Sequence, residues 1–127
     1  MTASTAAPVD SSSADDRPLL VGCLCAAWCR TCGDYRASFD ALAAEFAAQA
    51  RFVWVDIEDD EAALGDVDVM DFPTLLLARG EDIAFFGPVL PNPQAARQLL
   101  QRALARQLGR VQDASLAGLP QRIAALP

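Results

Sequence analysis

The sequence predicts a single α/β domain, and three observations lead to this class. Short apolar runs alternate with segments of helical periodicity, in the order strand, helix, strand, short helix, strand, strand, helix. A strand–helix–strand order implies a parallel pair with a right-handed crossover, whereas the last two strands are close enough for an antiparallel hairpin. The length of 127 residues suits one hydrophobic core. We therefore expect a mixed sheet of about four strands flanked by helices.

The first half of the chain contains two strands and the helix that joins them. Residues 18–25 (PLLVGCLC) form a continuous apolar run, which is typical of a strand buried on both faces. The chain is expected to turn helical at Cys29, and residues 34–48 carry apolar side chains at spacings of four, three and four. Residues 51–57 (RFVWVDI) are rich in β-branched and aromatic residues, which predicts a second buried strand.

The second half is predicted to contain a hairpin between a short helix and a long one. Residues 59–65 suit one or two helical turns, with Gly65 ending them. A third strand is expected at 74–78 and an antiparallel fourth at 83–86, which the pair Gly87-Pro88 is expected to break. An amphipathic helix should then run to about Gly109. Its start is indicated by Asn92 as N-cap and Pro93 at the first helical position.

The two ends of the chain differ in character from the domain expected at 18–109. Residues 1–17 are rich in Ser, Ala and Asp, and we expect a disordered tail because they are too polar to bury. Residues 110–127 carry apolar side chains at a loosely helical spacing. They either pack back on the domain or remain a frayed tail.

Composition excludes several classes of function. The net charge is −7, with neither lysine nor histidine, which argues against a nucleic-acid or anionic-membrane partner. Without histidine, no catalytic dyad can use an imidazole base. The first 17 residues lack the basic and apolar regions of a secretory signal, so we expect a cytoplasmic location. We also expect a monomer. A periplasmic location stays open if a leader has been removed.

A Cys-x-x-Cys motif lies at the junction between the first predicted strand and the helix. Cys29 precedes the helix and Cys32 follows about one turn later, so the two can close a disulfide. Free backbone N–H groups and the positive end of the helix dipole favour the ionised sulfur of the first cysteine. Arg30 adds a positive charge nearby. The motif predicts a two-electron thiol/disulfide switch.

Two motifs in this order resemble those of the thioredoxin family. Trp28-Cys29-Arg30-Thr31-Cys32 resembles the family's active site, and Phe72-Pro73-Thr74 resembles its second signature, in which a cis-proline before a buried strand faces the cysteines. The resemblance covers roughly residues 18–108 and implies a three-layer thioredoxin-like fold. Larger members carry an extra strand and helix before the active-site strand. Only the polar segment 1–17 stands there, so we expect that N-terminal unit to be missing.

The resemblance also implies a function and a set of site residues. It predicts a thiol–disulfide oxidoreductase that acts on protein disulfides or dithiols, needs no cofactor and is recycled by an external redox partner. Cys29 would be the nucleophile and Cys32 the resolving cysteine. The residues expected to contact the substrate are Trp28, Arg30, Thr31, Phe72, Pro73 and Gly87. The alternative is a redox-inert binding module that uses the groove formed by Trp28, Phe72 and Pro73.

Two positions depart from the family's pattern. Cys23 stands where many members bury an aspartate that accepts the proton of the second cysteine, and Trp54 stands where a lysine often faces it. Deprotonation of Cys32 would then depend on water or another carboxylate, with Glu58 the nearest candidate by position.

The remaining two cysteines, Cys23 and Cys25, share one face of the first strand. We expect both to be buried free thiols that act as small hydrophobes. The alternative joins all four thiols in a zinc or iron–sulfur site, which a strand followed by a helix does not readily form.

Overall fold

The computed structural model describes residues 18–65 and 67–126. These residues form one sheet of four strands in the order β3-β2-β4-β5. The strands are β2 (Leu19–Cys25), β3 (Ala50–Asp56), β4 (Thr74–Arg79) and β5 (Asp82–Pro88). The expectations of a disordered segment at 1–17 and of a missing N-terminal unit lie outside the described residues.

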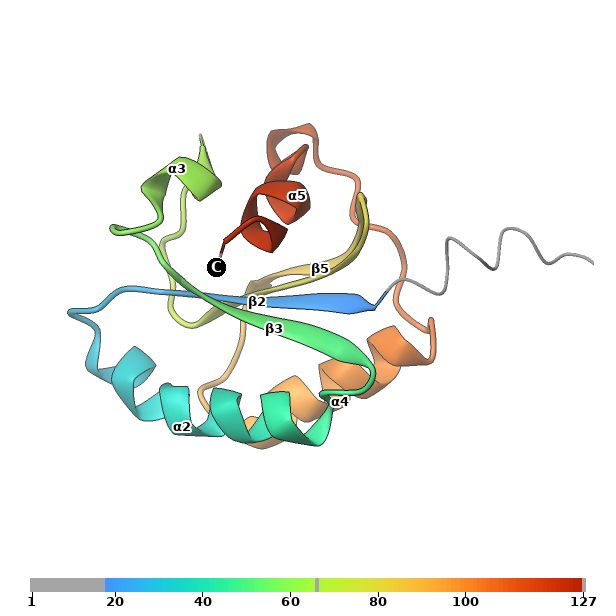
Figure 1. Ribbon diagram of the computed structural model, residues 1–127, viewed down its shortest axis with the longest axis horizontal. Coiled ribbons are helices and arrows are strands. Elements are labelled where there is room, and N and C mark those ends of the chain that lie inside the picture. The colour runs from blue at the N-terminus through green and yellow to red at the C-terminus, as the bar shows by residue number, and fades with distance from the viewer. Residues whose placement is uncertain (1–17, 66, 127) are drawn as a thin grey trace, which may run out of the picture.

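The sheet is sandwiched between two layers of helices, which confirms the predicted α/β class (Figure 1). On one face lie α2 (Arg30–Glu45) and α4 (Pro93–Leu104). On the other lie α3 (Glu61–Leu64), a 3₁₀ turn at Ala114–Leu116 and α5 (Leu119–Ala124). Within the described ranges, no helix is long and apolar enough to cross a bilayer.

Strand pairing is mixed, as the order of elements predicted. β2 runs parallel to β3 and antiparallel to β4, and β5 is the antiparallel edge strand. The expectation that residues 87–88 end the fourth strand is wrong, because β5 extends to Pro88, which pairs with Thr74. Proline is tolerated there because an edge strand has one row of backbone groups that needs no ladder partner.

β2 is the centre of the core, and all seven of its residues are buried. Because side chains alternate along a strand, its two faces supply two separate clusters. Leu19, Val21, Cys23 and Cys25 join the cluster shared with α2 and α4. Leu20 and Leu24 join the cluster that includes Leu119 and Ile123 of α5. The strand therefore presents its two cysteines to the layer that contains α2.

α2 and α4 cover this face through apolar stripes. Tyr35, Phe39 and Leu42 of α2 are buried at the predicted helical spacing. The Asn92 side chain accepts a hydrogen bond from the Ala95 N–H at 2.9 Å, which confirms Asn92 as the N-cap of α4.

The prediction that α4 continues to Gly109 is wrong, because the helix ends at Leu104. Arg106 adopts a left-handed conformation with φ 59°, and its N–H bonds to the Ala103 carbonyl. The Gln107 N–H bonds to the Arg102 carbonyl, which completes a Schellman motif. Apolar periodicity continued to Leu108 because that side chain still packs on the core after the helix has ended.

The C-terminal residues lie on the opposite face of the sheet (Figure 1). Leu119 and Ile123 of α5 are fully buried there. Arg122 donates to the Ala63 carbonyl from Nε at 2.7 Å and to the Leu64 carbonyl from Nη2 at 3.3 Å. Arg51 of β3 donates to the Ala124 carbonyl at 2.6 Å and to the Leu126 carbonyl at 3.0 Å. Two arginines thus bind α5 to α3 and β3.

Candidate active site

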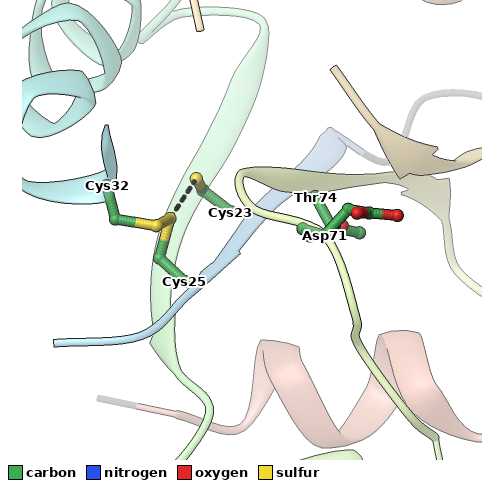
Figure 2. Close-up of a disulfide and its surroundings, with 5 residues drawn as sticks. All are labelled: Cys23, Cys25, Cys32, Asp71 and Thr74. Atoms are coloured by element: carbon green, nitrogen blue, oxygen red, sulfur yellow. Dashed lines mark hydrogen bonds between the residues drawn. A yellow bond between two sulfur atoms is a disulfide. The ribbon is translucent and has the colours of Figure 1, made fainter. Parts of the chain in front are cut away.

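A disulfide joins the end of the central strand to the start of α2. Figure 2 shows the bond between Cys25, the last residue of β2, and Cys32, in the first turn of α2. The Cα atoms are 5.8 Å apart, within the normal range for a disulfide. Both residues are 1% exposed. The bond lies in the core beneath α2, not on the surface.

This pairing corrects the expectation that Cys25 is a free buried thiol. Strand alternation directs Cys25 toward the α2 layer, and Cys32 is the buried residue of the first helical turn. Only seven positions separate the two residues, so the connection between strand and helix brings them together. Cys23 is a free buried thiol, as expected.

Cys29 is the N-cap residue of α2 and is a free thiol. It is half-buried, and its side chain makes no capping hydrogen bond. An N-cap side chain lies beside the N–H groups of the second and third helical residues, and here the third is Cys32. In this structure the Cys32 sulfur is bonded to Cys25 instead. The roles of Cys29 as nucleophile and Cys32 as resolving cysteine stay predictions.

Cys23 extends the row of sulfur atoms into the core. Its Sγ lies 3.9 Å from the Cys25 Sγ, the contact drawn dashed in Figure 2. Since the Cys25 sulfur is disulfide-bonded and has no hydrogen, Cys23 is the donor of this weak hydrogen bond. Burial raises the pKa of Cys23 from 9.0 to about 12, although the positive charge of Arg36 opposes the change. The Cys23 thiol is therefore protonated at neutral pH.

The position opposite Cys23 is occupied by an aromatic side chain. Trp54 of β3 pairs with Cys23 in the strand register, as the family positions of the aspartate and the lysine suggested. The Arg36 guanidinium lies 4.7 Å from the centre of the Trp54 ring, and Phe39 meets that ring edge-on. Arg36 of α2 and Trp54 of β3 thus form a cation–π pair at the position where family members often have a lysine.

An exposed aromatic pair flanks the cysteines. Trp28, immediately before Cys29, is 66% exposed and contacts Phe72 edge to face with ring centroids 5.7 Å apart. The Phe72–Pro73 peptide bond is cis. Thr74 Oγ1 donates to the Asp71 carbonyl at 2.6 Å, which holds the loop on both sides of this peptide (Figure 2). The structure therefore brings together three of the predicted substrate-contact residues.

The other predicted contact residues are more dispersed. Arg30 is exposed and Thr31 is half-buried, both in the first turn of α2. Gly87 pairs with Leu75 in the sheet, and a Cβ there would lie 3.6 Å from the Phe85 ring. Their contact with a substrate stays a prediction. Glu58, the expected proton acceptor for Cys32, is exposed in the turn after β3, where its N–H donates to Asp56 Oδ1 at 2.9 Å.

The alternative site that joins all four thiols is not formed here, because Cys25 and Cys32 are joined in a disulfide. Among residues 18–65 and 67–126, no group of three or more histidine, cysteine, aspartate or glutamate side chains is placed to hold a metal ion. The four cysteines form instead one disulfide and two free thiols.

A disulfide at a strand–helix junction, with a third thiol at the helix N-terminus, defines a site for thiol–disulfide exchange. Comparisons with known proteins agree. The family model described as Thioredoxin matches residues 5–90. Thioredoxin of Haemophilus influenzae is 33% identical over 87 residues, which cover 68% of this chain and 80% of that protein. The chain belongs to the thioredoxin family and is a thiol–disulfide oxidoreductase.

Solved structures share the fold at lower identity. Thioredoxin of Trypanosoma brucei brucei has a TM-score of 0.61 at 24% identity, and the match covers 75% of this chain and 82% of that one. Thioredoxin of Fasciola hepatica has a TM-score of 0.61 at 22% identity, with 74% and 89% covered. Deadhead of Drosophila melanogaster also has a TM-score of 0.61, at 20% identity, with 72% and 86% covered.

Proposed function

We propose that this oxidoreductase exchanges disulfides with protein partners, with Cys29 as the attacking thiolate and Cys32 as the sulfur that resolves the mixed disulfide. The observation that carries the proposal is the position of Cys29. It is a free, half-buried thiol at the N-cap of α2, three residues before the fully buried Cys32. Of these two sulfurs, Cys29 is the one that a partner can reach.

The surface beside Cys29 supports a protein substrate. Trp28 is largely exposed at 66%, and Phe72 packs edge-on against it next to the cis peptide. An exposed tryptophan beside a reactive thiol gives an extended partner chain a large apolar contact. Backbone groups at Phe72 can pair with that chain in the manner of an added strand. The predicted roles of Arg30, Thr31 and Gly87 belong to the same proposal.

The chemistry consists of two displacements. The Cys29 thiolate attacks one sulfur of the partner's disulfide, so that a mixed disulfide forms and the other partner sulfur leaves as a thiolate. The Cys32 thiolate then attacks the Cys29 sulfur and releases the partner as a dithiol. The protein ends with one disulfide and must be reduced by an external redox partner before the next cycle.

A trapping experiment tests these two roles separately. Cys32→Ala should accumulate a covalent adduct with insulin, because its Cys29 can attack but the mixed disulfide is not resolved. Cys29→Ala should give no adduct and no reduction of insulin by dithiothreitol above the uncatalysed rate. Non-reducing electrophoresis and mass spectrometry detect the adduct. An adduct that forms equally well in Cys29→Ala would contradict the proposal, since another thiol would then meet the partner.

A further inference from the structure

Two cysteines stand close to Cys32 in the chain, one at the end of β2 and one at the N-cap of α2. Cys32 is bonded to Cys25 of the central strand, and the half-buried free thiol Cys29 precedes it by three residues at the N-cap of α2. The sulfur of Cys32 therefore has two possible disulfide partners within the same short segment. The structure closes one pair, Cys25–Cys32, and leaves Cys29 free.

We propose that Cys25 is a third catalytic cysteine, which takes the Cys32 sulfur from Cys29 and stores the oxidised state as a buried disulfide. This inference rests on the proposed function, because the Cys29–Cys32 disulfide that feeds it is the product of partner reduction. A site with only Cys29 and Cys32 completes its cycle without a third cysteine that bonds to Cys32.

The transfer is balanced without another oxidant. The Cys25 thiolate attacks Cys32 Sγ, the Cys25–Cys32 bond forms, and the Cys29–Cys32 bond breaks. Cys29 leaves as a thiolate and takes up the proton that Cys25 gave up, so the protein retains one disulfide throughout. The two electrons needed to open that disulfide are supplied later by the external redox partner. In the reverse step, Cys29 attacks Cys32 and Cys25 leaves.

Cys23 is placed to assist the buried end of this exchange. Its S–H points to Cys25 Sγ at 3.9 Å, the atom that leaves as a thiolate in the reverse step. A thiolate buried at this depth is costly unless a hydrogen bond stabilises it. Because burial raises the pKa of Cys23 to about 12, this thiol stays a donor and does not compete as a nucleophile. Cys23 is thus a positioning residue for the exchange.

The transfer changes which sulfur meets solvent. In the stored state both bonded sulfurs belong to residues that are 1% exposed, whereas Cys29 is a half-buried free thiol. A reductant dissolved in solvent has no direct path to the disulfide and must act through Cys29. The oxidised protein therefore keeps an accessible nucleophile, unlike a site with only the Cys29–Cys32 pair.

Peptide mapping of the oxidised wild-type protein is the first test and requires no variant. The protein is oxidised with a small disulfide, free thiols are alkylated in acid, and the peptides are mapped by mass spectrometry. We expect label on Cys29 and, after unfolding, on Cys23, with Cys25 and Cys32 linked. A map that links Cys29 to Cys32 in essentially all molecules would overturn the proposal.

Disulfide equilibrium constants give the quantitative test. If two internal disulfides compete for Cys32, the wild-type constant for disulfide formation equals the sum of those of Cys25→Ala and Cys29→Ala. We expect the wild-type constant to exceed that of Cys25→Ala by at least about tenfold, or about 30 mV in potential. Equal constants for these two proteins, or a Cys29→Ala protein that keeps all three thiols, would refute the role of Cys25.

Failure of the transfer to Cys25, called the relay below, is distinguishable from failure of the proposed function. If neither wild type nor Cys32→Ala forms a bond with insulin, the proposed function fails even when both internal disulfides are mapped. If Cys32→Ala traps insulin while Cys25 is never linked in the oxidised wild type, only the relay fails. Thermal melting of each alanine variant verifies that it is folded.

Discussion

Ile123 of α5 packs directly over Gly22 in the central strand. A Cβ at Gly22 would lie 3.4 Å from Ile123 Cγ2, and the Ile123 side chain is fully buried. The absence of a side chain in the middle of β2 therefore lets α5 approach the sheet closely. This contact fixes the C-terminal residues on the face of the sheet opposite the disulfide.

Removing the Ile123 side chain should destabilise the whole domain. Ile123→Ala empties a fully buried site, and such substitutions cost about 2–5 kcal/mol of the free energy of unfolding. Urea unfolding measures this loss. Gln121→Ala, an exposed position on the same helix, is the control and should change stability by less than about 0.5 kcal/mol. Equal effects of the two variants would show that α5 contributes little to the core.

A double-mutant cycle tests the contact with Gly22. Gly22→Val adds methyl groups in the volume that Ile123 fills, which should cost about 1–3 kcal/mol. In the Ile123→Ala background the same change enters a cavity and should cost less. Additive effects would mean that the two residues are not coupled.

The sequence predicted the elements of this fold well because local patterns determine them. β2 reads as a continuous apolar run, and the stripe of Tyr35, Phe39 and Leu42 marks α2. The end of α4 was missed because a Schellman motif with Arg106 in the left-handed region carries no sequence signal as clear as glycine. Element ends depend on a single residue's conformation, whereas element type depends on many side chains.

The Cys25–Cys32 pairing was missed for a different reason. Cys25 shares a strand face with Cys23, and both were expected to be buried free thiols. The signal was nevertheless present, since alternation directs Cys25 toward the helix layer and Cys32 occupies the buried side of the first turn. Pairing across two layers requires their packing geometry, which spacing alone does not give. The motif around Cys29 was recognisable because its residues are contiguous.

Tyr35 of α2 buries a polar hydroxyl group in the core. The residue is 2% exposed, and its hydroxyl has no hydrogen-bond partner within the described residues. An unpaired buried polar group costs about 1–3 kcal/mol, so Tyr35→Phe should raise the free energy of unfolding by about 1 kcal/mol. Urea unfolding at neutral pH checks this. A loss of stability in Tyr35→Phe would show that the hydroxyl is satisfied in solution.

Stability should fall at alkaline pH because of Cys23. Its folded-state pKa is raised by burial from 9.0 to about 12, so between these values the unfolded chain releases a proton that the folded protein keeps. The contribution of Cys23 to the free energy of unfolding is complete below pH 9 and is lost as pH rises toward 12. The slope is at most about 1.4 kcal/mol per pH unit. The sequence has no lysine, which leaves few other groups to titrate there.

The measurement compares how steeply the free energy of unfolding changes with pH in two proteins, not their absolute stabilities. Unfolding free energies of wild type and Cys23→Ala are followed from neutral pH into the alkaline range, with Cys29 alkylated in both to prevent exchange. Cys23→Ala should show the shallower decline. A residual slope is expected from Tyr35, whose pKa burial and the nearby Cys23 raise from 10.0 to about 12. Parallel curves would mean that Cys23 does not retain its proton on folding.

Trp28 should matter for protein substrates and not for stability. Because its side chain is 66% exposed, Trp28→Ala removes little buried area, and the melting temperature should change only slightly. Burying a large apolar side chain against a partner is worth about 1.5–3 kcal/mol, so kcat/KM for insulin should fall by about 10–100-fold. Attack on the small disulfide dithionitrobenzoate should be much less affected, since that molecule does not extend across the Trp28–Phe72 pair. Trp28→Phe retains an aromatic edge for Phe72 and should recover most of the insulin activity. If Trp28→Ala slowed both disulfides equally, Trp28 would act on the Cys29 thiol itself and not as a surface for the partner chain.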